Sequence, residues 1–249
     1  MNKLLKVFIA FFLVLSLGTP SVFAENSQGK DSLVALGDSV PFGYNLSEYN
    51  NHPAKNAYPY LISDEADLRV RNLGVPGWQT SDLLAAIKTN KKYQQAILHA
   101  DYVTITIGGN DFLEILRTAN AESGGNPQLF QQLIQQKLFT SQAFGNLTAS
   151  IEEIRKLTDS PIVLYNAYNP FQLNNPLHHI SNLFLPQVNA AFTGIAYSYS
   201  DVRVADAYRA FSNNQANYVI PQDIHPTIAG QEELAKIGLR ALQFDYITR

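Results

Sequence analysis

Short apolar runs alternate along this chain with longer amphipathic segments. The runs cover residues 33–36, 68–73, 102–107, 162–165 and 202–204. The third run reads Tyr-Val-Thr-Ile-Thr-Ile, and such β-branched side chains favour a strand packed within a sheet. The pattern therefore predicts five strands.

The segments between these runs have the spacing of amphipathic helices. They cover residues 80–87, 128–138, 141–157, 184–199 and 227–244. In the third segment, steps of three and four residues place one apolar set on a single helix face: Phe144, Leu147, Ile151, Ile154 and Leu157. Alternating strands and helices predict an α/β fold, with a parallel sheet covered on both faces. In such a sheet, ligands bind beyond the carboxyl ends of the strands.

The N-terminal segment has the pattern of a secretory signal peptide. Lys3 and Lys6 precede an uncharged apolar run, and small residues lead to a cleavage site after Ala24. The run is shorter than the roughly 20 residues of a membrane-spanning helix, so we expect no membrane anchor. We expect residues 1–24 to be removed and residues 25–249 to form one secreted domain.

The composition of the chain limits the binding partners and the catalytic groups that we expect. A net charge of −3 and the lack of a long basic run give no electrostatic footprint for nucleic acid or anionic lipid. With no cysteine, the chain has no disulfide, thiolate metal site or thiol nucleophile, so catalysis must use oxygen or imidazole. His178 and His179 are neighbours and point in different directions on a helix, so they do not make a metal pair. We expect neither metal nor cofactor.

Four short motifs carry candidate chemistry. They are Gly37-Asp38-Ser39, Asn72-Leu73-Gly74, Gly108-Gly109-Asn110-Asp111 and Asp223-Ile224-His225-Pro226. The first three follow predicted strands, so we expect them at one edge of the sheet. Acyl transfer needs a nucleophile, a base and oxyanion donors, and Ser39, His225, the Gly74 N–H and the Asn110 amide fit these roles. Each motif alone also fits ordinary turn or capping chemistry, but together they favour a catalytic site.

The four motifs, in this order, resemble those of the SGNH or GDSL-type esterases and lipases. The resemblance covers residues 33–242. It implies a flavodoxin-like, three-layer α/β/α sandwich around a mainly five-stranded parallel sheet. It also implies that Ser39 is the nucleophile of a carboxylic ester hydrolase and His225 the base, with oxyanion donors at Ser39, Gly74 and Asn110.

The catalytic acid departs from the family pattern. That pattern places a carboxylate three residues before the histidine, where this chain has Gln222. The nearest carboxylate, Asp223, stands two residues before His225. Three arrangements are open. Asp223 reaches the His225 imidazole through a shifted turn, or Gln222 or a backbone carbonyl accepts the hydrogen bond of the imidazole. In the third arrangement, a carboxylate distant in the sequence accepts that bond. We favour Asp223.

The substrate class is less defined. The resemblance implies lipids, lysophospholipids, acylated thiols or acetylated sugars. Apolar residues between positions 112 and 138 have the pattern of a lid over an acyl chain, which favours a lipase or lysophospholipase-like esterase. The alternatives are a carbohydrate acetyl esterase, a thioesterase, or a non-catalytic secreted binding protein with the same fold. We expect a monomer that acts on a small-molecule or lipid ester.

Overall fold

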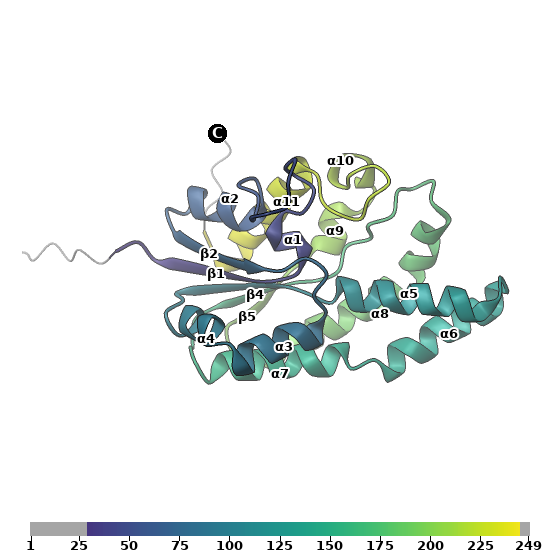
Figure 1. Cartoon of the computed structure of the whole chain (residues 1–249), viewed down its shortest axis with the longest axis horizontal. Helices are drawn as coiled ribbons and strands as arrows, with labels where there is room; N and C mark the ends of the chain where they lie inside the picture. Colours follow the sequence, from purple (N-terminus) through teal and green to yellow (C-terminus); the bar gives the residue numbers. More distant parts are fainter. Residues whose placement is uncertain (1–28, 245–249) are drawn as a thin grey trace, which may run out of the picture.

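A computed structural model describes residues 29–244, and the expected signal peptide lies outside them. Its centre is a five-stranded parallel sheet in the order β2-β1-β3-β4-β5 (Figure 1). The strands are β1 (Ser32–Gly37), β2 (Arg69–Gly74), β3 (Tyr102–Thr106), β4 (Ile162–Tyr165) and β5 (Val202–Ala205). All five predicted strands are confirmed, each within about a residue or two of its apolar run.

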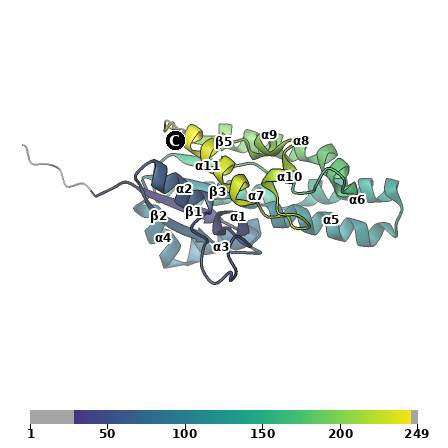
Figure 2. The ribbon, with the colours of Figure 1, turned by 90° about the horizontal axis from the view of Figure 1, so that it is seen from above.

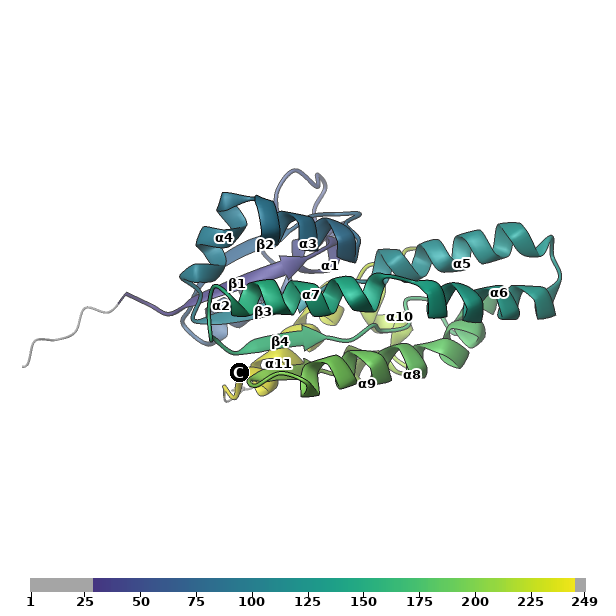
Figure 3. The ribbon, with the colours of Figure 1, turned by 90° about the horizontal axis from the view of Figure 1, so that it is seen from below.

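Helices cover both faces of the sheet, which confirms the three-layer α/β/α sandwich. On one face lie α1 (Ser39–Phe42), α2 (Tyr58–Glu65), α9 (Ala207–Phe211), α10 (Gln215–Tyr218) and α11 (Ile228–Leu242) (Figures 1 and 2). On the other lie α3 (Thr80–Thr89), α4 (Lys91–Leu98), α7 (Ala143–Arg155) and α8 (Pro176–Tyr197) (Figure 3). Each face has its own apolar cluster, and Leu33, Leu36 and Ile105 are fully buried between them. Each such side chain contributes roughly 1.5–3 kcal/mol by its removal from water.

Two further helices project beyond the sheet. Figure 3 shows α5 (Gly109–Ser123) and α6 (Pro127–Thr140) lying side by side as a hairpin. Ile115, Phe130 and Ile134 are buried in the apolar cluster of the adjoining layer, so part of the expected lid belongs to the core instead. Leu113 and Leu116 of α5 line a pocket. The hairpin is therefore a packed element, and its helix α5 also forms one wall of that pocket.

The long helix α8 begins earlier than the pattern predicts. Its first eight residues, from Pro176 to Leu183, precede the predicted segment 184–199. Asn175 caps this start by accepting the Leu177 N–H, and Pro176 fits the first helical position, which needs no donor. Pro186 lies inside the helix and has no N–H to donate to the carbonyl one turn earlier. The predicted segment begins two residues before Pro186, where a proline falls in the first helical turn and is tolerated. Within residues 29–244, no helix is long and apolar enough to span a membrane.

Candidate active site

Strand register brings the first three motifs together. Gly37, at the end of β1, pairs with Gly74 on β2 and with Thr106 on β3. At Gly37, φ is 143°, and a Cβ there would collide with the Thr106 carbonyl, so only glycine allows this close approach. The next residues therefore leave the sheet at the carboxyl edge of its strands, as predicted.

Ser39 is the first residue of the short helix α1, directly beyond β1. The Asp38 side chain caps this helix, since its Oδ1 accepts the Val40 N–H at 2.9 Å. The helix ends at Gly43, where φ is 74°. This tight turn holds Ser39 in a fixed orientation at the base of the pocket.

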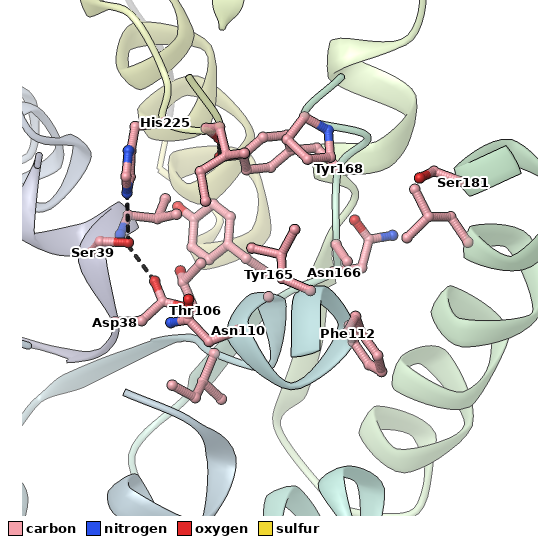
Figure 4. A pocket seen from close by; sticks show the side chains of 18 of the residues that line it. Asp38, Ser39, Thr106, Asn110, Phe112, Tyr165, Asn166, Tyr168, Ser181 and His225 are labelled. Carbon is pink, nitrogen blue, oxygen red and sulfur yellow. Dashed lines mark hydrogen bonds between the residues drawn. The ribbon is translucent and has the colours of Figure 1, made fainter. Parts of the chain in front are cut away.

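Ser39, His225 and Asp223 form a continuous chain of contacts. The His225 Nε2 and Ser39 Oγ atoms lie 3.0 Å apart, and Figure 4 shows the imidazole directed at the serine. On the other side of the ring, Nδ1 and Asp223 Oδ1 are 2.7 Å apart. Because an ionised carboxylate only accepts, Nδ1 donates to Asp223, which leaves Nε2 free to accept the Ser39 proton.

A turn explains how Asp223 reaches the histidine from two residues away. The Asp223 N–H donates to the Ile220 carbonyl at 3.0 Å, and the intervening Pro221 and Gln222 are the central residues. Proline followed by a residue at φ 61° is the pattern of a type II turn. The turn directs Gln222 toward solvent and Asp223 toward the ring. Of the three arrangements left open by the sequence, the structure has the first.

Asp223 is held in its ionised form by several donors. Burial raises the pKa of its carboxyl, but hydrogen bonds from Asn45, from the Ile224 N–H and from His225 outweigh burial and lower the pKa overall. The Asn45 Nδ2–Oδ2 distance is 2.7 Å, and the Ile224 N–Oδ1 distance is 2.6 Å. Sequence reasoning missed Asn45, which is 178 residues away from Asp223 along the chain. Its backbone has a left-handed φ of 63°, which asparagine adopts more readily than most residues, but the sequence near Asn45 does not indicate the contact with Asp223.

The Asn110 amide is oriented by a neighbouring loop. Asn110 lies in the first turn of α5, after Gly108 at φ 106°, and lines the pocket with Ser39. Its Nδ2 donates to the Trp78 carbonyl at 2.8 Å, which fixes the amide and leaves a second N–H on the same nitrogen. Next to it, Asp111 accepts the N–H and hydroxyl of Thr80 and ties α5 to α3. Asp111 thus has a structural partner.

The Gly74 N–H, which was expected to bind the oxyanion, donates to a side chain of its own strand. This N–H donates to Asn72 Oδ1 at 3.0 Å, and Gly74 is not among the residues that line the pocket. A Cβ at position 74 would lie 2.9 Å from both the Asp38 carbonyl oxygen and the Phe42 nitrogen. The close contact of β2 with the Ser39 turn therefore accounts for this glycine.

A second glycine on the same loop lies beside the Asn110 anchor. The Trp78 N–H donates to the Val75 carbonyl at 3.3 Å, and Gly77 lies between them at φ 84°. No atom lies within 4 Å of where a Gly77 Cβ would stand, so its backbone is open on that side. Sequence reasoning missed Gly77, although Pro76-Gly77 is a standard turn signal.

Asp38 is the most perturbed acid at the site. Its side chain lines the pocket, although the residue is only 4% exposed. Burial, which disfavours the charged form, raises the pKa of Asp38 from 3.8 to about 7; the Val40 N–H lowers it in part, and the charge of Asp111 raises it further. Asp38 is therefore a buried carboxyl that titrates near neutral pH.

The pocket extends from the Ser39–His225 pair between α5 and α8. Its empty space is about 750 Å³, part of it open to solvent. Its walls are mostly apolar, and the residues beyond Asn110 include Phe112, Leu113, Leu116, Pro170, Phe171 and Leu185. A nucleophile and base at one end of an apolar pocket can hydrolyse an ester whose acyl group fills that pocket.

Known proteins are similar to this chain in sequence and in fold. The chain matches the model of the GDSL-like lipase/acylhydrolase family over residues 35–233. It is 33% identical over 153 residues to the uncharacterized protein YpmR of Bacillus subtilis, covering 59% of this chain and 56% of that protein. It is 25% identical over 210 residues to the spore germination lipase LipC of Bacillus licheniformis, covering 81% of this chain and 92% of that protein. The crystal structure of the lipase Lip_vut3 from a goat rumen metagenome superposes with a TM-score of 0.68 at 22% identity, covering 85% of this chain and 97% of that chain.

Proposed function

This chain belongs to the GDSL-like lipase/acylhydrolase family and is a carboxylic ester hydrolase, and we propose that Ser39, His225 and Asp223 are its nucleophile, base and acid. One observation carries this proposal. His225 lies 3.0 Å from the Ser39 hydroxyl on one side of its ring and 2.7 Å from the Asp223 carboxylate on the other. This is the order of contacts that a serine hydrolase requires.

In the proposed reaction, His225 Nε2 takes the proton of Ser39 as Oγ attacks the ester carbonyl carbon. The tetrahedral intermediate then collapses, the ester C–O bond breaks, and His225 returns the proton to the leaving alcohol. Water repeats the sequence on the acyl-enzyme, releasing the acid and free Ser39. Asp223 stabilises the imidazolium in both halves because its carboxylate stays ionised.

We assign the oxyanion to the Ser39 N–H and the free N–H of the Asn110 side chain. Both residues line the pocket at its reactive end. Neither Gly74 nor Gly77 is among the residues that line the pocket, but the Gly74 N–H has a partner in Asn72, so Gly77 is the better candidate for a third donor. The Trp78 carbonyl links the Gly77 turn to the Asn110 amide, which brings that turn to the oxyanion side of the site.

We propose acyl esters with extended apolar chains as substrates, as in lipids or lysophospholipids. Leu113, Leu116 and Leu185 would be left uncovered by an acetyl group, whereas a longer chain removes them and itself from water. A relative of this chain, LipC, is named a lipase. Acetylated sugars and thioesters are the alternative substrates.

We further propose that the protein is exported, that cleavage follows Ala24, and that residues 25–249 act as a monomeric domain. The Lys3 and Lys6 pair followed by an apolar run supports export. Sequencing the N-terminus of the protein recovered from the culture medium, together with its mass in solution, tests all three statements.

Labelling with a fluorophosphonate probe tests the mechanism. The native protein should be modified at Ser39, and the Ser39→Ala variant should not. A series of p-nitrophenyl esters from acetate to palmitate then tests the substrate class, with kcat/KM expected to rise toward the longer chains. If the native protein is neither labelled nor active on any ester, a non-catalytic binding role replaces the enzymatic one.

A further inference from the structure

Ser181 of α8 is a buried polar residue with an unusual environment. It is 5% exposed and lines the pocket. Figure 4 shows it at the end of the pocket opposite Ser39 and His225. Its Oγ has no hydrogen-bond partner among residues 29–244. Buried hydroxyls are normally paired, so this one, at the wall of a ligand pocket, is available to a polar atom that enters the pocket.

Several other helical hydroxyls in this protein are satisfied by their own helix. Five of them donate to the carbonyl one turn earlier, namely those of Thr89, Thr118, Thr140, Ser150 and Thr193, and the hydroxyl of the C-cap residue Ser198 does the same. Ser181 also lies inside a helix, where the same bond to residue 177 is available. Its hydroxyl does not form that bond and lies at the pocket wall instead.

Because the surrounding pocket wall is apolar, the Ser181 hydroxyl can discriminate between acyl chains with and without an oxygen atom. Beyond Asn110, the pocket residues from α5 and α8 are Phe112, Leu113, Leu116 and Leu185, together with Ser181. A plain hydrocarbon chain lying against this wall would strip water from the Ser181 Oγ and offer no replacement. A chain that carries an oxygen at the same depth would restore the lost hydrogen bond.

The reaction geometry indicates which part of the ester lies there. His225 must protonate the leaving alcohol, so the alcohol stays on the His225 side of Ser39. The acyl group then extends along Asn110 and Phe112 toward Ser181 (Figure 4). We propose that Ser181 is a specificity-determining residue that recognises a hydroxyl or keto oxygen on the acyl chain of the substrate. A serine hydroxyl both donates and accepts, so it suits either group. This inference rests on the proposed function, because it requires the ester bond to lie at Ser39.

Esters with the hydroxyl placed at different carbons test the inference. The substrates are p-nitrophenyl esters of one saturated fatty acid and of the same acid carrying a single hydroxyl at each successive carbon. We expect kcat/KM of the native enzyme to peak at one hydroxyl position, above the plain ester. Ser181→Ala should lower kcat/KM at that peak about threefold to tenfold and raise it for the plain ester, so that the preference changes by roughly tenfold or more. Ser181→Cys, a weaker donor of similar shape, should fall between the two.

Ser150→Ala is the matched control, because it also deletes a buried helical hydroxyl, one that is bonded to the Asn146 carbonyl and lies outside the pocket lining. It should leave the preference unchanged, and fluorophosphonate labelling checks that each variant keeps its site. An active native enzyme with no preferred hydroxyl position, or a Ser181→Ala variant that changes both esters equally, overturns the inference and leaves the esterase function standing. A native protein that is inactive on every ester and unlabelled overturns the proposed function, and this inference with it.

Discussion

Replacing Asp38 by asparagine should change how the stability of this protein depends on pH. Asp38 is buried beside the nucleophile, and its Oδ1 accepts the Val40 N–H at 2.9 Å. An asparagine oxygen can accept the same bond, so Asp38→Asn removes the ionisable group and keeps the cap of α1. Burial raises the Asp38 pKa from 3.8 to about 7, and this shift is absent in the variant.

The sign and size of the change in unfolding free energy follow from the shift in the Asp38 pKa. Between pH 3.8 and about 7, the folded protein holds a proton on Asp38 that the unfolded chain has released. The free energy of unfolding of the native protein therefore falls as pH rises through this window. A shift of about 3 pKa units corresponds to about 4 kcal/mol at roughly 1.4 kcal/mol per unit. Relative to the native protein, Asp38→Asn should gain about this much stability between pH 4 and pH 8.

Urea unfolding curves at fixed ionic strength measure the difference directly. The two proteins are compared at several pH values across the window, and only the difference between their unfolding free energies is used, so that other titrating groups cancel. The difference between the two unfolding free energies should widen from about pH 4 to about pH 7 and stay constant above that pH. Two parallel profiles would show that Asp38 does not take up a proton on folding, and the argument from burial would be refuted.

Three further substitutions test the Asp223 side of the site. Asp223→Asn should lower kcat by roughly 10³–10⁴-fold, as loss of the orienting acid does in serine proteases, and a loss under tenfold in ester hydrolysis would remove Asp223 from the mechanism. Asn45→Ala should lower kcat about tenfold with KM unchanged, because Asp223 loses a 2.7 Å donor; an unchanged kcat in the same assay would show that Asn45 does not position Asp223. Gln222→Gly should raise the free energy of unfolding by about 0.5–1 kcal/mol in urea, since glycine adopts φ 61° without strain, and a decrease would contradict the turn geometry.

The sheet was predictable because each strand is marked by the apolar residues of its own short segment. The central strands β1, β3 and β4 are buried on both faces, so each reads as a short apolar run, whereas the edge strands β2 and β5 also carry arginines. The alternation with helices leaves few topologies. The helices were predicted less completely. The predicted segments leave out α2, α4, α5, the short helices α1, α9 and α10, and the first eight residues of α8. Gly108 precedes α5 and Gly109 is its first residue, and glycine argues locally against a helix.

The site was predictable in part. Ser39, His225 and Asn110 follow from motifs that stand beside strand ends or in the C-terminal segment, and the structure brings them to one pocket. The pairing of Asp223 with His225 depends on the left-handed backbone of Gln222, which the sequence alone does not reveal. Gly74 and Asn45 show the same limit, because their contacts join chain segments that only the folded protein brings together.

The large separation along the sequence between the two reacting side chains has a consequence for biosynthesis. Ser39 follows the first strand of the sheet, and its partner His225 comes 186 residues later, just before α11. A ribosome-bound chain that has emerged only as far as β5 therefore carries the nucleophile without the group that deprotonates it. The enzyme becomes competent only when its C-terminal segment docks against the sheet. Labelling of Ser39 by a mechanism-based probe thus reports completion of the native topology, as well as catalytic power.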